Sequence, residues 1–238
     1  MKKTIVGVFA HPDDESISAG GTFYKAVQEG HDLYLICATR GSASTKFDRD
    51  YVKKEELSIV REKEMLRAGE VLGAKGVLFL DMIDGTLDQV EDNEGIRRLA
   101  QVLSPLEADV IVTFEPNGIS LHKDHKAIHR WTMEVVKRGL LRKQPERIYW
   151  STIDNKAGRK RQGQLMGHSS DEINTVVDIE GVQEAKGQAI LQHRTQLRML
   201  EDNKLIVDGK LQRRMTREYF IRVDENSKTL PIRENFIV

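Results

Sequence analysis

The chain has 238 residues, and its 37 Lys and Arg residues are balanced by 37 Asp and Glu residues. This balance excludes a charge-driven nucleic-acid or anionic-membrane partner, and the length suits a single α/β domain spanning residues 1–238. No apolar run approaches the roughly 20 residues that cross a bilayer, and the single cysteine cannot form an internal disulfide, so we expect a cytoplasmic protein.

Short apolar runs alternate with amphipathic segments through the first part of the chain. The runs are rich in β-branched residues, which predicts buried strands, whereas helical spacing of apolar residues predicts helices between them. We expect strands at 4–10, 31–39, 76–81 and 109–116, and helices at 16–30, 55–74, 93–108 and 122–141. This alternation predicts a Rossmann-like, doubly wound α/β fold with a mostly parallel sheet and helices on both faces.

The second part of the chain has weaker patterns. Three further strands are expected at 147–153, 173–179 and 218–223, and one helix at 181–201. Two polar segments without periodicity, 40–54 and 154–171, are expected to be loops, because small and polar residues dominate them. The second loop is basic and Gly-rich, and it could cover a site at the edge of the sheet.

Histidines and acids follow two of the predicted strands. The stretch AHPDDES, residues 10–16, follows the first strand, and the HKDH motif, residues 122–125, follows the fourth. Because the C-terminal ends of parallel strands meet at one edge of a sheet, His11, Asp14 and His125 can converge there. Two histidines and one carboxylate are typical ligands of a catalytic zinc or similar divalent ion. Asp13 could then accept a proton from water.

Each motif also has a simpler explanation. An isolated HxxH pattern is common at a solvated helix start, and consecutive acids are favoured near a helix N-terminus by its dipole. Their coincidence at two strand ends favours the metal site. For the histidines His31 and His129 a structural role is expected, whereas His193 has no assigned role.

The same motifs resemble the zinc-dependent de-N-acetylases of the PIG-L/LmbE family. These enzymes act on N-acetylglucosaminyl substrates and include enzymes of mycothiol and bacillithiol synthesis. The resemblance continues through TRGSAS, REKEMLRAGEVLGA, LFLDMIDGTL and AILQHRTQ, so it covers most of residues 4–200. It implies His11, Asp14 and His125 as ligands of Zn2+, with Fe2+ as another option. It also implies Asp13 as general base, and His122 as the group that steadies the oxyanion and could protonate the leaving amine.

The chain departs from this family pattern near the expected substrate. Many relatives have Gly-Glu-Ala-Gly after the second strand, where this chain has Gly-Ser-Ala-Ser at residues 41–44. Ser120 stands where some members have a tyrosine that polarises the carbonyl. Arg40, at the entrance of the loop, is expected to contact a substrate hydroxyl or an anionic group.

The sequence therefore predicts metal-dependent hydrolysis of the acetamide of an N-acetylglucosaminyl small-molecule conjugate, which releases acetate and an amine. One alternative is a metallohydrolase of another amide or ester. A second is an inactive or non-enzymatic Rossmann-like module that binds a metal or a nucleotide, although HPDDE replaces the expected Gly-rich turn and would repel a pyrophosphate. The aglycone and the oligomeric state are left open, a homo-oligomer being one option.

Overall fold

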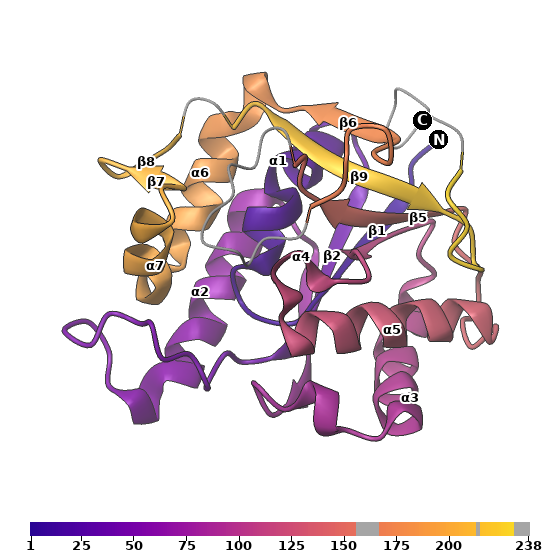
Figure 1. The fold of residues 1–238 in the computed structure, drawn as a ribbon, viewed down its shortest axis with the longest axis horizontal. Coiled ribbons are helices and arrows are strands. Elements are labelled where there is room, and N and C mark those ends of the chain that lie inside the picture. Colours follow the sequence, from indigo (N-terminus) through magenta and orange to yellow (C-terminus); the bar gives the residue numbers. More distant parts are fainter. Residues whose placement is uncertain (156–166, 213–214, 231–238) are drawn as a thin grey trace.

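The computed structural model describes residues 1–155, 167–212 and 215–230. Its centre is a seven-stranded sheet with the order β3-β2-β1-β4-β5-β9-β6 (Figure 1). Strands β1 to β5 run parallel, whereas β9 pairs antiparallel with both β5 and β6. The strands are β1 Thr4–Phe9, β2 Asp32–Thr39, β3 Gly76–Met82, β4 Val110–Phe114, β5 Arg147–Thr152, β6 Thr175–Asp178 and β9 Arg217–Val223.

Two groups of helices cover the sheet on opposite sides (Figure 1). One group packs together as α1, α2 and α6, and the other as α3 and α5. This arrangement confirms the predicted doubly wound, mostly parallel α/β fold. The helices are α1 Asp14–Gln28, α2 Leu57–Leu72, α3 Asp92–Leu103, α4 Gly118–Leu121, α5 Lys123–Lys137, α6 Gln183–Gln192 and α7 Leu197–Asp202, and a small hairpin joins β7 Ile206–Val207 to β8 Lys210–Leu211.

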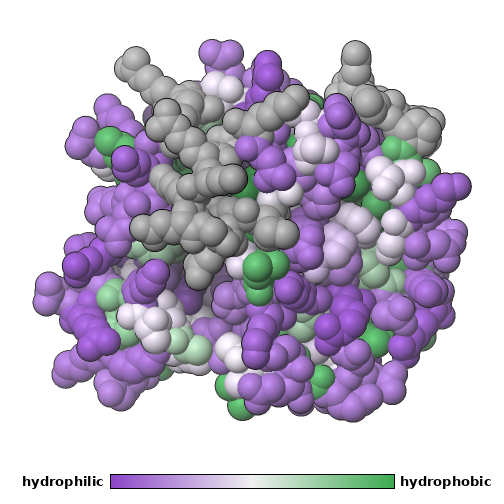
Figure 2. Space-filling model, viewed as in Figure 1, coloured by the Kyte–Doolittle hydropathy of each residue, from purple (hydrophilic) through white to green (hydrophobic). Residues whose placement is uncertain are grey.

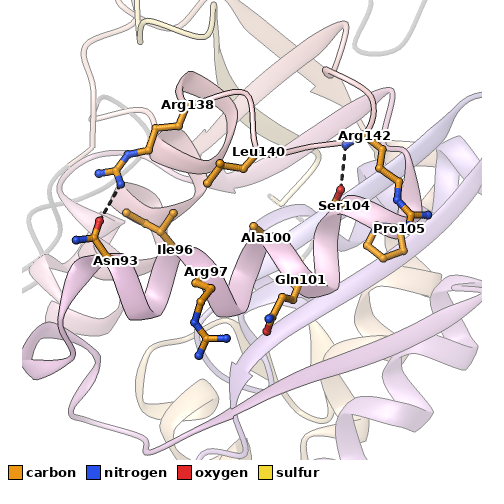
Figure 3. Close-up of a pocket in the computed structure, with 10 residues that line it drawn as sticks. All are labelled: Asn93, Ile96, Arg97, Ala100, Gln101, Ser104, Pro105, Arg138, Leu140 and Arg142. Atoms are coloured by element: carbon orange, nitrogen blue, oxygen red, sulfur yellow. Dashed lines mark hydrogen bonds between the residues drawn. The ribbon is translucent and has the colours of Figure 1, made fainter.

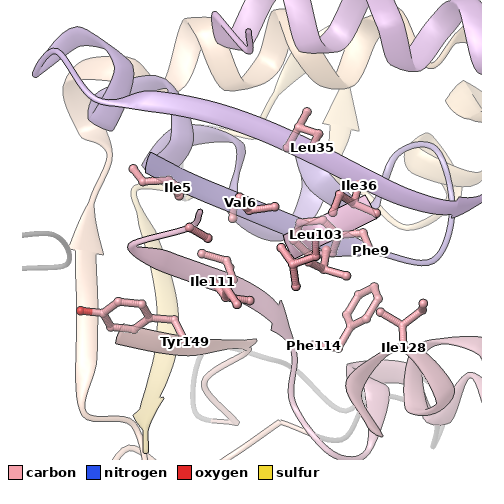
Figure 4. Packing of buried hydrophobic residues seen from close by; sticks show 14 of the residues in the cluster. Ile5, Val6, Phe9, Leu35, Ile36, Leu103, Ile111, Phe114, Ile128 and Tyr149 are labelled. Carbon is pink, nitrogen blue, oxygen red and sulfur yellow. The ribbon is translucent and has the colours of Figure 1, made fainter. Parts of the chain in front are cut away.

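The hydrophobic core lies around the central strands, which are covered on both faces (Figure 4). The ring of Phe9 at the end of β1 makes edge contacts with Phe23 of α1 and Phe114 of β4, at centroid distances of 6.2 and 5.2 Å. A parallel strand with helices on both sides must be apolar on both faces, which explains the nearly continuous apolar run of β1. The core thus fixes the end of β1 beside the end of β4.

The structure differs from the sequence prediction in the segment 181–201. One continuous helix is expected there, but α6 ends at Gln192 and α7 begins at Leu197. His193 has φ −81° and ψ 57°, which is not helical. Its ring and the backbone N–H of Thr195, two residues later, instead bond to the buried acids Glu15 of α1 and Glu64 of α2. These tertiary bonds outweigh the helical periodicity of the sequence.

Several predictions are not tested by the fold. Most of the predicted loop 154–171 lies outside the described residues. Among the described helices, none has the length and apolar character needed to cross a bilayer. The face in Figure 2 is mainly hydrophilic, with small separate hydrophobic areas. Cys37 is buried and free in β2; the cytoplasmic location and the single-domain organisation stay predictions.

Candidate active site

The predicted ligands lie at the point where the order of the strands in the sheet reverses, between β1 and β4. Strands β1 and β4 are neighbours in the sheet, and the helices that follow them, α1 and α5, belong to opposite groups. This is the switch point at which open α/β sheets bind ligands. His11 and Asp14 follow β1, and His125 follows β4 at the start of α5. The structure therefore brings His125 to His11 and Asp14, although more than a hundred residues separate it from them.

The donor groups of His11, Asp14 and His125 face one another as a triangle of side chains. The Nδ1 atom of His11 lies 3.2 Å from Nε2 of His125 and 3.4 Å from Oδ2 of Asp14. Nε2 of His125 lies 3.4 Å from Oδ1, the other oxygen of Asp14, so each oxygen of this carboxylate faces one of the two rings. Around a tetrahedral zinc with bonds of about 2.0–2.2 Å, neighbouring donor atoms lie roughly 3.3–3.6 Å apart. The triangle thus has the size that one tetrahedral ion requires.

The second nitrogen of each ring is hydrogen-bonded away from the triangle. Nδ1 of His125 lies 3.0 Å from the carbonyl oxygen of Gly118, and the ring stacks on Phe114 with a centroid distance of 4.0 Å. Nε2 of His11 lies 3.0 Å from Oδ2 of Asp124. Each of these nitrogens therefore carries a proton, so the nitrogens that face the triangle are the ones that would bind a metal.

Two other groups of donor atoms among the described residues could also hold an ion, one formed by His11, His122 and His125 and one by His11, Asp84 and Asp124. The second group contains two carboxylates. Both carboxylates, however, already accept backbone N–H groups. Asp124 accepts from Gly85 and Leu87 at 2.7 and 3.0 Å, and Asp84 accepts from Ala43 at 2.6 Å. Both face the same nitrogen of His11, Asp84 at 3.1 Å. These contacts fit an orienting role towards His11 better than a second metal site.

The electrostatics of the triangle favour a cation. Burial opposes ionisation of Asp14, but His125 and His11 hold its pKa well below its usual range. Burial lowers the pKa of His125 to about 4, so this ring is neutral near pH 7. Burial also works against a charge on His11, yet its hydrogen bonds to Asp124, Asp14 and Asp84 raise its pKa well above the ordinary value. Positive charge is therefore stabilised at this point.

The segment between β4 and α5 is held in an unusual conformation. Gly118, Ile119 and Leu121 all have positive φ angles, of 67°, 60° and 61°. Such a conformation is rare for a β-branched residue. The buried carboxylate of Glu115 stabilises it, because it accepts the N–H groups of Asn117 and Ile119 at 2.8 and 2.6 Å. The segment delivers the Gly118 carbonyl to His125.

Asp13 lies at the start of α1, next to the triangle. As the residue that precedes a helix, an aspartate usually caps it, but Asp13 makes no such side-chain bond. Its Oδ2 lies 3.3 Å from Nη2 of Arg61, which also donates to the carbonyls of Pro12 and Gly41. Burial raises the pKa of Asp13 to about 7, although Arg61 favours the ionised form. Such a group can both accept and release a proton near neutral pH.

His122 completes the cluster from the other side. Its ring centroid lies 4.7 Å from that of His11 and 4.8 Å from that of His125. Its Nδ1 accepts the backbone N–H of Asp124 at 3.2 Å. A nitrogen that accepts this bond carries no proton, so the neutral ring has its N–H at Nε2. Burial and the neighbouring His11 lower the pKa of His122, which favours this neutral form.

The remaining predicted site residue, Arg40, is not brought to the cluster. Its Nε donates to Glu62 at 2.7 Å, it pairs with Asp81, and it lies over the ring of Phe79 at 4.9 Å. Its proposed contact with substrate stays a prediction. Arg61 is the arginine that reaches the cluster instead.

Two residues at the site had no predicted role. Asp84 follows β3 at the same edge of the sheet, so the rule that indicated the other two strand ends could have found it. Arg61 lies inside α2, where no local pattern distinguishes it from a surface arginine. The one sequence feature connected with Arg61 is Gly41, which has a φ of +69° and where a Cβ atom would collide with the guanidinium of Arg61.

A groove of about 530 Å³ lies elsewhere, between α3 and the chain that follows α5 (Figure 3). Arg97, Arg138 and Arg142 line it, and Arg138 donates to Asn93 at 2.8 Å. None of the residues discussed above lines this groove. The candidate active site is therefore defined by its side chains rather than by this cavity.

This chain is similar to known deacetylases in sequence and in fold. A malate-conjugate enzyme of Bacillus subtilis (strain 168), "Probable N-acetyl-alpha-D-glucosaminyl L-malate deacetylase 2", is 30% identical over 207 residues, which cover 85% of this chain and 89% of that protein. The N,N'-diacetylchitobiose deacetylase from Pyrococcus horikoshii has a similar fold, with a TM-score of 0.69 at 20% identity, covering 94% of this chain and 85% of that one.

A second structure of similar fold has another activity. GalB, the 4-carboxy-2-hydroxymuconate hydratase of a Pseudomonas, aligns with a TM-score of 0.67 at 18% identity, covering 99% of this chain and 100% of that one. The fold alone therefore does not decide the reaction. The family model described as "GlcNAc-PI de-N-acetylase" matches residues 6–136, more than half of the chain. This match confirms the resemblance expected from the sequence, and the chain belongs to the PIG-L family.

Proposed function

We propose that this protein is a metal-dependent de-N-acetylase, which hydrolyses the acetamide of an N-acetylglucosaminyl small-molecule conjugate. The observation that carries the proposal is the triangle of donor groups from His11, Asp14 and His125, whose facing atoms lie 3.2–3.4 Å apart. The buried carboxylate of Asp13 comes from the residue before Asp14. The names of relatives within the same family support the choice of an acetamide as substrate.

We propose zinc as the resident ion. Two imidazole nitrogens and one carboxylate oxygen suit zinc, and Fe2+ also accepts this set of ligands. A divalent ion held there would polarise the acetamide carbonyl and lower the pKa of bound water, leaving the proton transfers to the protein.

Asp13 is the proposed general base. Its ionised carboxylate accepts a proton from the attacking water, while the oxygen of that water forms the new bond to the carbonyl carbon. Arg61 lies beside one oxygen of the carboxylate and restricts its rotation. The fixed position lowers the entropic cost of aligning base and water.

His122 is the proposed donor to the oxyanion. Its Nδ1 is occupied by the N–H of Asp124, so the neutral ring offers Nε2–H as a hydrogen-bond donor. A neutral imidazole in this form cannot readily give up a further proton. The proton for the leaving amine therefore comes from Asp13, which received it from water. One carboxyl group thus serves as base and then as acid.

The group attached to N-acetylglucosamine in the substrate is not determined by the ligand triangle or by Asp13. Malate, inositol or a second sugar are the candidates, and Arg40 remains a proposed contact for a hydroxyl or an anionic group. A homo-oligomer and a cytoplasmic location also remain proposals.

The test is the release of amine and acetate by zinc-loaded protein from N-acetylglucosamine, an N-acetylglucosaminyl malate conjugate, an N-acetylglucosaminyl inositol conjugate and diacetylchitobiose. Equal amounts of amine and acetate from one substrate, with loss of activity in Asp13→Asn, are expected. Bound zinc without any cleavage would reject the acetamide and direct the search to other amides and esters. If the protein instead adds water to an unsaturated acid, a hydratase is favoured. If it binds a nucleotide tightly without metal, a binding module is favoured.

A further inference from the structure

The backbone of Asp13 adopts a conformation that an L-residue avoids. Its φ is 120° and its ψ is −29°, outside the usual left-handed region. Such strain persists only where surrounding bonds impose it. The carboxylate of Asp13 does not cap α1, so its own side chain does not hold this turn. Another group must hold the Asp13 peptide.

The carboxylate of Glu15 is that group. Its Oε2 accepts the backbone N–H of Asp13 at 3.0 Å, and its Oε1 accepts the hydroxyl of Ser16 at 2.6 Å. Glu15 is completely buried, and so is its partner His193, whose Nε2 lies 2.7 Å from the same Oε1. A buried carboxylate with these bonds has a fixed direction.

His193 comes from a distant part of the chain. It follows α6 directly, and its non-helical conformation turns the ring towards the start of α1. The Nδ1 atom of the same ring is buried and has no hydrogen-bond partner among the described residues. The single ring bond, to Glu15, is therefore what this buried histidine contributes.

We infer that Glu15 and His193 are positioning residues, which hold the strained peptide of Asp13 and thereby keep its carboxylate at the donor triangle. The inference rests on the proposed function, in which Asp13 is the base. His193 fixes Glu15, Glu15 fixes the N–H of Asp13, and neither side chain needs to contact the substrate.

A purely structural role is the competing explanation, since the pair also joins α6 to α1. A second buried ion pair joins the same two helices and provides a matched control. Glu218 of β9 accepts the N–H groups of Gly21 and Thr22 in α1, at 3.0 and 2.8 Å, and pairs with Lys186 of α6. Neither Glu218 nor Lys186 has a hydrogen bond or ion pair to Asp13 or to the ligand triangle. Glu218→Gln should thus lower stability without a specific effect on turnover.

The test compares two replacements of His193 that differ by one methylene group. In His193→Gln the amide can reach Glu15, whereas in His193→Asn it is too short. For His193→Asn we expect kcat to fall about 10- to 100-fold with KM within about twofold of the wild type. The bound zinc per chain should be unchanged, and His193→Gln should recover most of kcat.

Two results would overturn the inference: equal kcat in His193→Asn and the wild type, or an equal fall in Glu218→Gln at a matched melting temperature. If the wild type deacetylates nothing, the proposed function fails, and the crystal structure of His193→Asn then decides the positioning role. An unchanged φ at Asp13 in that variant rejects it, and a relaxed backbone with a displaced carboxylate supports it. If His193→Asn does not fold, the same measurements are made on Ser16→Ala and on Glu15→Gln, which weaken the same set of bonds.

Discussion

Nη2 of Arg61 lies 3.3 Å from Oδ2 of Asp13, and both side chains are almost completely buried. The same guanidinium donates to the carbonyls of Pro12 and Gly41. One planar group therefore links the end of β1, the loop after β2 and the proposed base. A lysine ammonium could not make these three contacts together, because its donors do not form a fork.

Arg61→Lys is therefore expected to impair both stability and turnover. The loss of one buried bond costs about 1–3 kcal/mol, and a displaced Asp13 should lower kcat about tenfold or more. Thermal unfolding and steady-state kinetics measure the two effects. The control is Arg67→Lys, because Arg67 lies exposed on the same helix. Wild-type kcat in Arg61→Lys would mean that this arginine does not orient the base.

Asp124→Asn should weaken metal binding. The carboxylate accepts N–H groups from Gly85, Leu87 and His11 with both of its oxygens, whereas an asparagine has a single acceptor oxygen. His11 then loses part of its orientation, and the affinity for zinc should fall about 10- to 100-fold. Competition with a chromophoric chelator measures it. Asp88→Asn, which alters an exposed acid in the segment that carries Gly85 and Leu87, is the control, and equal affinities in both variants would contradict the orienting role.

Removal of the metal should abolish turnover and lower the melting temperature. Without an ion, the donor atoms of His11, His125 and Asp14 remain buried at close range. An ion present at about 1,000 times its dissociation constant stabilises the folded chain by about 4 kcal/mol. We expect chelation to lower the melting temperature, and one equivalent of zinc to restore both properties. Full activity after complete removal of metal, verified by elemental analysis, would contradict the proposed chemistry.

The fold and the ligand triangle could be predicted because their signals are local. Apolar runs mark β1 and β4, and the histidines and acids follow directly at the strand ends. Parallel pairing then brings His11 and His125 to one edge by topology alone. No side-chain contact has to be known for this step.

The network behind the triangle could not be predicted in the same way. Arg61, Glu15 and His193 act through contacts between helices whose rotation and spacing depend on packing. In the sequence, His193 continues the periodic pattern of a helix, and the bonds of His193 to Glu15 and of Thr195 to Glu64 explain why the helix stops before it. Tertiary hydrogen bonds thus decided both the break in the helix and the surroundings of Asp13.

Because His129 is buried and neutral, we expect the protein to lose stability in mild acid. Its Nδ1 lies 2.8 Å from the carbonyl oxygen of Phe114, and burial lowers its pKa to about 4, whereas an unfolded histidine titrates near about 6.5. As the pH falls, the histidine of the unfolded chain binds a proton before that of the folded chain. The contribution of neutral, buried His129 to the free energy of unfolding is therefore complete above about pH 6.5 and is lost as the pH falls to about 4. The shift corresponds to about 3 kcal/mol. His129→Gln retains a donor towards Phe114 but does not titrate, so its unfolding free energy should fall less over this interval. Urea unfolding of the metal-free proteins from pH 4 to pH 8 measures the difference, and parallel profiles for the variant and the wild type would show that His129 does not contribute.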